Sequence, residues 1–126
     1  MIREVMGGKL HLVRITQCNL DYEGSCAIDQ NLLDAANILP FERIHIYNVN
    51  SGQRLDTYAI PGRRGSGMIG LNGAAARLAQ KGDRVIIVTY VQVNEDEIAS
   101  HRSTVIMVDE KNQPVKTIRH SLRSKS

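Results

Sequence analysis

The stretch RIHIYNVNSGQRLDTYAI, residues 43–60, has the clearest structural pattern in the chain. Apolar and polar residues alternate over 43–49 and again over 54–60, which is typical of strands with one buried face. The intervening Asn-Ser-Gly is typical of a turn. The stretch therefore predicts a β-hairpin, with Ile44, Ile46 and Asn48 on one face of its first strand.

Further strands are predicted on both sides of this hairpin. Residues 9–16 alternate, and the apolar run within residues 84–93 predicts burial on both faces of that strand. Shorter strands are predicted at 25–28, 68–71 and 104–108. Frequent turns and several short strands indicate a mainly-β domain, most simply a small barrel.

Short helices complete this barrel. Residues 29–37 predict a helix, with Asp29 as its N-cap and Asn37 as its C-cap. Asn72 is a candidate N-cap for a second helix through AAARLAQ, residues 74–80. One acidic helical turn is predicted at 95–101. The glycine-rich segment 61–67 is expected to be a loop.

Length and composition indicate one domain spanning 1–126 with an aliphatic core. The chain has 126 residues, 42% of them hydrophobic and only 4% aromatic. The net charge of +3 depends on a basic tail, because residues 1–114 alone carry −1. We expect residues 115–126 to be flexible and solvated. The alternative is that this tail makes the domain a non-catalytic nucleic-acid-binding β-barrel.

The two cysteines, Cys18 and Cys26, have neither the spacing nor the companions of a zinc site. We therefore expect free thiols and no metal. The first residues lack the apolar core of a signal peptide, and no apolar run is long enough to span a bilayer. The sequence thus predicts a cytoplasmic protein that binds no membrane.

The segment Tyr22-Glu23-Gly24-Ser25-Cys26 carries the most specific chemical possibility. The Ser25 hydroxyl can attack the Gly24 carbonyl, and elimination from the resulting ester followed by hydrolysis leaves a pyruvoyl group on residue 25. A pyruvoyl carbonyl forms a Schiff base with an amine and then accepts electrons. Taken alone, Gly-Ser is a common turn dipeptide, so this pair by itself is weak evidence.

Four blocks of sequence give this pair a context: GKLHLVRIT (8–16), DYEGSCAIDQNLLDAA (21–36), YNVNSGQRLDTYAI (47–60) and LNGAAARLAQKGD (71–83). In order and spacing they closely resemble the bacterial pyruvoyl-dependent aspartate 1-decarboxylases, over about residues 1–100. The resemblance implies a double-psi β-barrel and a homotetramer with active sites between subunits. It also implies decarboxylation of L-aspartate to β-alanine for pantothenate and coenzyme A biosynthesis.

The resemblance further implies self-cleavage between Gly24 and Ser25, giving chains 1–24 and 25–126. Ser25 would become the pyruvoyl group, the only cofactor. Thr57 would assist the backbone rearrangement, and His11 would lie near the cleavage site. We expect Tyr22 and Glu23 to shape a strained turn there. Whether cleavage is spontaneous or needs a maturation factor stays open.

For the substrate, the resemblance implies that Tyr58 donates a proton to the α-carbon. Arg54 and Lys9 would hold carboxylate. A turn with small residues would bind substrate beside Thr57; its residues are Asn72, Gly73, Ala74 and Ala75. Some family members have Trp where this chain has Tyr47. A pseudoenzyme reading is disfavoured because the expected reactive residues are intact.

Overall fold

The structure is a computed structural model that describes residues 1–123. The strands are β1 (Ile2–Arg14), β2 (Gln17–Asn19), β3 (Ser25–Asp29), β4 (Arg43–Asn48), β5 (Arg54–Gly62), β6 (Ile69–Asn72), β7 (Arg84–Asn94), β8 (Arg102–Val108) and β9 (Pro114–Ser121). The helical segments are α1 (Gln30–Ala36) and the 3-10 helices η1 (Gly73–Leu78) and η2 (Glu95–Glu97). The predicted mainly-β, barrel-like architecture is confirmed.

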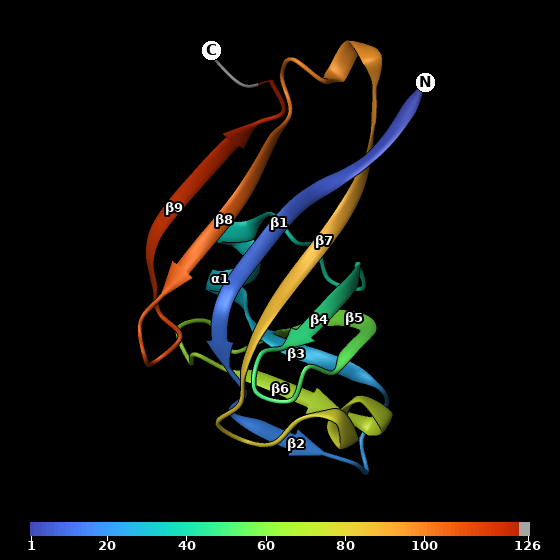
Figure 1. Cartoon of the computed structure of the whole chain (residues 1–126). Helices are drawn as coiled ribbons and strands as arrows, with labels where there is room; N and C mark the ends of the chain where they lie inside the picture. Colours follow the sequence, from blue (N-terminus) through green and yellow to red (C-terminus); the bar gives the residue numbers. More distant parts are fainter. Residues whose placement is uncertain (124–126) are drawn as a thin grey trace.

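The strands hydrogen-bond in the order β2-β6-β3-β5-β4-β7-β1-β8-β9. In Figure 1, β1, β7, β8 and β9 form a long twisted arm, and β2, β3, β5 and β6 lie at the opposite end of the molecule. Three neighbouring pairs are parallel, namely β1 with β8, β2 with β6 and β3 with β5. Parallel pairing joins segments that are distant in sequence, so these contacts set the overall fold.

The predicted hairpin is confirmed as β4 and β5, which pair in antiparallel fashion with Tyr47 opposite Arg54. Ile44, Ile46 and Asn48 are buried on one face of β4, as the alternation predicts. The buried Asn48 amide is satisfied because it donates to the Asp83 carboxylate at 2.9 Å and accepts from two turn N–H groups. The hairpin is thus fixed to the loop before β7.

Strand β7 lies between β1 and β4. Val85, Ile87 and Val88 are buried, but Ile86 is half-buried, so burial on both faces is only partly realised. Strand β1 begins earlier than predicted because its first residues pair with the end of β7. A bulge at Gly7 and Gly8 separates the two parts of β1.

Gly8 is required by a close approach of two backbones. A Cβ at this position would lie 2.1 Å from the carbonyl oxygen of Ala36, the last residue of α1. The Gly8 N–H donates to the buried Thr89 hydroxyl at 2.9 Å, which compensates for the disturbed strand ladder. The bulge therefore seats α1 against β1.

Helix α1 is confirmed with both predicted caps. The Asp29 carboxylate accepts from the Asn31 N–H, and Asn37 adopts a left-handed conformation with φ 56°. The second predicted helix is wrong in type and cap. Gly73 has φ +64°, which no α-helix accommodates at its start, and the Asn72 side chain makes no cap hydrogen bond. A 3-10 helix forms instead.

The prediction of a flexible tail from residue 115 is wrong for residues 115–121, which belong to β9 and pair with β8. Val115, Thr117 and Ile118 favour strand structure, and an edge strand tolerates the exposed charges of Lys116 and Arg119. The end of the predicted tail, residues 124–126, lies outside the described residues.

Asp29 connects α1 to the loop before β6. Its fully buried carboxylate also accepts from the N–H groups of Gly65 and Gly67 at 2.9 and 2.8 Å. The buried Asn112 amide donates to the Gly67 carbonyl at 2.8 Å and pairs with the backbone of Arg14. These two side chains replace strand pairing where the loop is irregular.

Replacing Asp29 by alanine should destabilise the protein strongly. The change removes the α1 cap and leaves two loop N–H groups without their acceptor, so we expect a loss of about 3 kcal/mol in unfolding free energy. Urea denaturation measures it. Asp34→Ala is the matched control because it removes an exposed ion pair with Arg64 and should cost much less. Equal losses in the two variants would contradict the role given to Asp29.

Candidate active site

Ser25 is the first residue of β3 and is almost fully buried, with 3% of its surface exposed. Its hydroxyl oxygen accepts a hydrogen bond from the Asn72 side-chain N–H at 3.0 Å and donates to the Glu23 carbonyl at 3.3 Å. Ser25 and Asn72 are directly opposite each other in the antiparallel β3–β6 pair. Strand register therefore holds Asn72 beside the hydroxyl. The side-chain oxygen of Asn72 is buried and has no hydrogen-bond partner.

The backbone before Ser25 packs tightly against Gly73. A Cβ on Gly73 would lie 2.8 Å from the Gly24 Cα and nitrogen and 2.9 Å from the Tyr22 carbonyl oxygen. The close backbone approach expected of this turn is therefore present at Gly73. Gly24 itself does not have positive φ, and a Cβ there would meet nothing within 4 Å. The φ of Gly24 therefore gives no sign of the strained turn expected there, and Gly73 adopts its positive φ without strain because it is a glycine.

Thr57 and Tyr58 lie on β5, the parallel neighbour of β3. Cys26 pairs with Ala59, so one residue earlier the register brings Tyr58 level with Ser25, and Thr57 level with Gly24. The two side chains point to opposite faces of β5, because successive residues of a strand alternate. They nevertheless flank the same end of β3.

Phe41, which no sequence pattern singles out, covers Tyr58. The two rings stack with their centroids 5.9 Å apart at an interplanar angle of 24°. Phe41 is 73% exposed and has φ 71°, an uncommon conformation for a bulky residue. Its N–H donates to the Ala59 carbonyl at 2.7 Å, which holds the loop against β5. Only the fold brings these two aromatic residues together.

Arg54 is the first residue of β5, whereas Tyr58 lies in the middle of the strand. The Arg54 guanidinium carbon sits 4.1 Å from the centre of the Tyr47 ring. An open hollow of ≈ 330 Å³ surrounds it, lined by His45, Tyr47, Arg54, Leu55 and Asp56. Arg54 is exposed, so its charge is available to an anion from solution. A guanidinium can bind a carboxylate through two parallel N–H donors, and this role of Arg54 stays a prediction.

Lys9 and His11 lie on β1. Lys9 pairs with Val88, which also pairs with His45, so Lys9 and His45 share one outer face of the sheet. Burial, and secondly the charge of Lys9, lower the pKa of His11 below its usual value, which keeps the ring neutral at neutral pH. The sheet order places three strands between β1 and β3. His11 therefore lies beside Lys9 on β1, away from Ser25 within the sheet.

One chain thus presents two separate groups of candidate residues. The first, around the start of β3, comprises Ser25, Thr57, Tyr58 and Asn72; the second comprises Lys9, His11 and Arg54. Tyr58 lies four residue positions after Arg54 on β5, a backbone rise of about 13 Å along an extended strand. The ion pair between Arg43 and Asp56, 2.7 Å long, occupies the surface between them. The backbones of Arg54 and Tyr58 are thus well apart, although alternation puts both side chains on the same face of β5.

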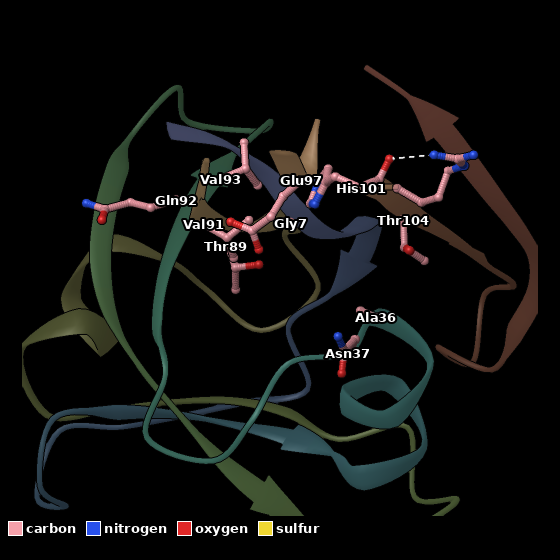
Figure 2. Close-up of a pocket in the computed structure, with 11 residues that line it drawn as sticks. Gly7, Ala36, Asn37, Thr89, Val91, Gln92, Val93, Glu97, His101 and Thr104 are labelled. Carbon is pink, nitrogen blue, oxygen red and sulfur yellow. Dashed lines mark hydrogen bonds between the residues drawn. The ribbon is translucent and has the colours of Figure 1, made fainter. Parts of the chain in front are cut away.

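A second hollow, of ≈ 300 Å³, lies between the C-terminal end of α1 and strands β1, β7 and β8. Figure 2 shows Glu97 and His101 at its rim; the dashed line is the hydrogen bond from Arg102 to the His101 carbonyl. None of the predicted site residues lines this hollow. It is therefore separate from both groups described above.

Within residues 1–123 no group of three or more His, Cys, Asp or Glu side chains is placed to hold a metal ion. Nor does that part of the chain contain a helix with the length and apolar character needed to cross a membrane. Both cysteines are free; burial raises the pKa of Cys26 to about 12, while Cys18 is exposed. Neither thiol is a plausible nucleophile at neutral pH.

Comparisons with known proteins identify the family of this chain. The family model described as aspartate decarboxylase matches residues 1–115. Aspartate 1-decarboxylase 2 of Polaromonas sp. (strain JS666 / ATCC BAA-500) is 51% identical over 122 residues, which cover 97% of this chain and 96% of the relative. Aspartate 1-decarboxylase of Cupriavidus necator is 56% identical over 112 residues, covering 89% and 93% of the two chains. That of Psychromonas ingrahamii is 54% identical over 117 residues, covering 93% of each chain. The chain belongs to the aspartate decarboxylase family.

Proposed function

We propose that this chain is the precursor of a pyruvoyl-dependent aspartate 1-decarboxylase, which cuts itself between Gly24 and Ser25. The mature enzyme converts L-aspartate to β-alanine and CO₂ in the cytoplasm, and β-alanine supplies pantothenate and coenzyme A synthesis. The relatives named aspartate 1-decarboxylase support the substrate. The observation that carries the proposal is a buried serine hydroxyl, directly after a glycine, held by Asn72.

The first step is attack of the Ser25 oxygen on the Gly24 carbonyl carbon, which converts the amide to an ester. The hydrogen bond from Asn72 fixes the hydroxyl, and Thr57, level with Gly24 in the β3–β5 register, is suited to stabilise the oxyanion. Elimination then releases Gly24 as a carboxylate. Hydrolysis of the dehydroalanine at residue 25 gives the pyruvoyl group and ammonia.

The surroundings of residue 25 fit such a group. The Asn72 side-chain N–H that holds the Ser25 oxygen is a donor suited to a pyruvoyl carbonyl, and the unpaired Asn72 oxygen is an acceptor suited to a substrate amine. Gly73 offers no side chain that would fill the space beside the turn. A pyruvoyl group here would supply an electrophilic carbonyl that takes up the substrate amine and withdraws electrons as CO₂ leaves. Tyr58, level with residue 25, is suited to deliver a proton to the substrate α-carbon.

Arg54 and Lys9 supply the cationic groups that a dicarboxylate needs. Because one chain keeps Arg54 about 13 Å from Tyr58 along β5, we propose that a second copy of the chain completes the site. The homotetramer expected for the family satisfies this requirement. His11, which faces the Lys9 group, would then approach the cleavage turn of the neighbouring copy.

Self-cleavage is tested by intact mass spectrometry after prolonged warm incubation. We expect two pieces, residues 1–24 and residues 25–126, the second with a carbonyl in place of its amino terminus. Ser25→Ala should remain one chain because it lacks the nucleophile. A chain that stays uncut, even after addition of extract from the source organism as a source of a maturation factor, would reject the proposal.

Tyr58→Phe should split normally but decarboxylate poorly. Loss of the proton donor should lower kcat by about 100-fold or more, while the aromatic stack with Phe41 is retained. CO₂ release and β-alanine formation measure the rate, and mass spectrometry verifies processing. A processed variant with kcat close to wild type would assign the proton transfer to another group.

The shared site is tested by co-assembly of two inactive variants, Arg54→Ala and Ser25→Ala. Arg54→Ala keeps the cleavage turn and should still split. If each site takes residue 25 and Arg54 from different copies, random co-assembly should restore about a quarter of the wild-type activity. Separately expressed variants mixed just before the assay are the control. Co-assembled protein as inactive as its components would show that one chain builds the whole site.

A further inference from the structure

A series of side-chain contacts connects Arg54 on β5 to β4 and then to β7. Its guanidinium lies over the Tyr47 ring at 4.1 Å. The Tyr47 hydroxyl forms a hydrogen bond of 2.7 Å with the Tyr90 hydroxyl on β7. The Tyr90 ring in turn meets the His45 ring edge-on, with centroids 5.1 Å apart at 75°. Arg54 is therefore linked to β7 through two aromatic side chains.

The tyrosine pair has a partly exposed position that packing alone does not explain. Tyr90 is 39% exposed and Tyr47 is half-buried, both on the outer face of the sheet. Hydroxyls in such positions can bond to water, so pairing them contributes little stability unless it fixes a geometry. What the pair fixes is the plane of the Tyr47 ring, on which the arginine rests.

We propose that Tyr90 is a positioning residue: its hydroxyl holds the Tyr47 ring, and that ring orients the Arg54 guanidinium toward the substrate carboxylate. This inference rests on the proposed function, in which Arg54 binds carboxylate. A long, exposed arginine samples many rotamers and loses that freedom on binding. A stacked guanidinium already presents its two parallel N–H donors in one plane, so less freedom is lost.

The protonation state of Tyr90 is consistent with this role. The hydrogen bond to Tyr47, together with partial burial, raises the pKa of Tyr90 above its ordinary value, although the nearby charge of Arg54 opposes the rise. The Tyr90 hydroxyl therefore stays protonated at neutral pH and does not compete as an anion for the guanidinium. Arg54 keeps its charge for the substrate.

Tyr90→Phe deletes the hydroxyl and keeps the ring against His45. We expect normal self-cleavage, kcat within about twofold of wild type, and a KM for aspartate raised about fivefold, the effect of one lost hydrogen bond. The inhibition constant of succinate, a dicarboxylate without an amine, should rise by the same factor. Tyr47→Phe should behave alike, and the double variant should be no worse than either single variant.

The decisive comparison uses Arg54→Lys, which cannot present parallel donors. In that background Tyr90→Phe should not raise KM further, because nothing remains for Tyr47 to orient. Thr117→Val, which deletes an exposed hydroxyl on β9, is the control and should leave KM unchanged.

The positioning role would be overturned by an equal KM increase from Tyr90→Phe in both backgrounds, or by a fall in kcat without a change in KM. Either would indicate a general structural effect. An active wild-type enzyme whose KM is insensitive to Tyr90→Phe rejects the positioning role alone. A wild-type chain that neither splits nor decarboxylates aspartate rejects the proposed function and this inference together.

Discussion

The placement of β3 is the constraint on which the site depends. All five residues of this strand, Ser25–Asp29, are buried, and it pairs with β5 on one side and β6 on the other. Its last residue is anchored because the Asp29 carboxylate accepts three backbone N–H groups. A slip of one residue would turn Ser25 to the opposite face and break all three of these bonds. The anchor at one end of β3 thus fixes the reactive residue at the other.

Strand register then determines which other side chains lie beside Ser25. The β6 partner opposite Ser25 is Asn72, and the parallel β5 neighbour supplies Tyr58 at the same level. Gly73, the residue after Asn72, has no side chain, so the turn at Gly24 fits against the Gly73 backbone. No loop has to move for these groups to meet. The proposed cleavage site is therefore a product of sheet pairing, which would let a short chain build it without a cofactor-binding domain.

Local patterns predict local structure well in this chain. The hairpin over 43–60 and the caps of α1 at Asp29 and Asn37 depend on residues near in sequence, and the structure confirms them. Contacts between distant residues escape such patterns. Strand β9 forms because β8 has a free edge with which it pairs. The Asn72 side chain, predicted to cap a helix, instead donates a hydrogen bond to Ser25 on another strand. The Gly-Ser pair gained meaning only through the resemblance of four separate blocks, whereas the stacking of Phe41 on Tyr58 had no sequence signal.

Because β5 is rigid, the distance along it between Arg54 and Tyr58 is fixed. A hydrogen-bonded strand cannot shorten, so the rise from Arg54 to Tyr58 is as fixed as the sheet itself. The β4–β5 pairing and the ion pair of Arg43 with Asp56 oppose any local folding-over of the strand. A flexible loop could have carried an arginine to Ser25 within one chain, but this fold places the arginine on a strand. Under the proposed function, association of copies would bring a rigid, pre-oriented cation to a rigid electrophile, so that little conformational freedom would be lost when substrate binds.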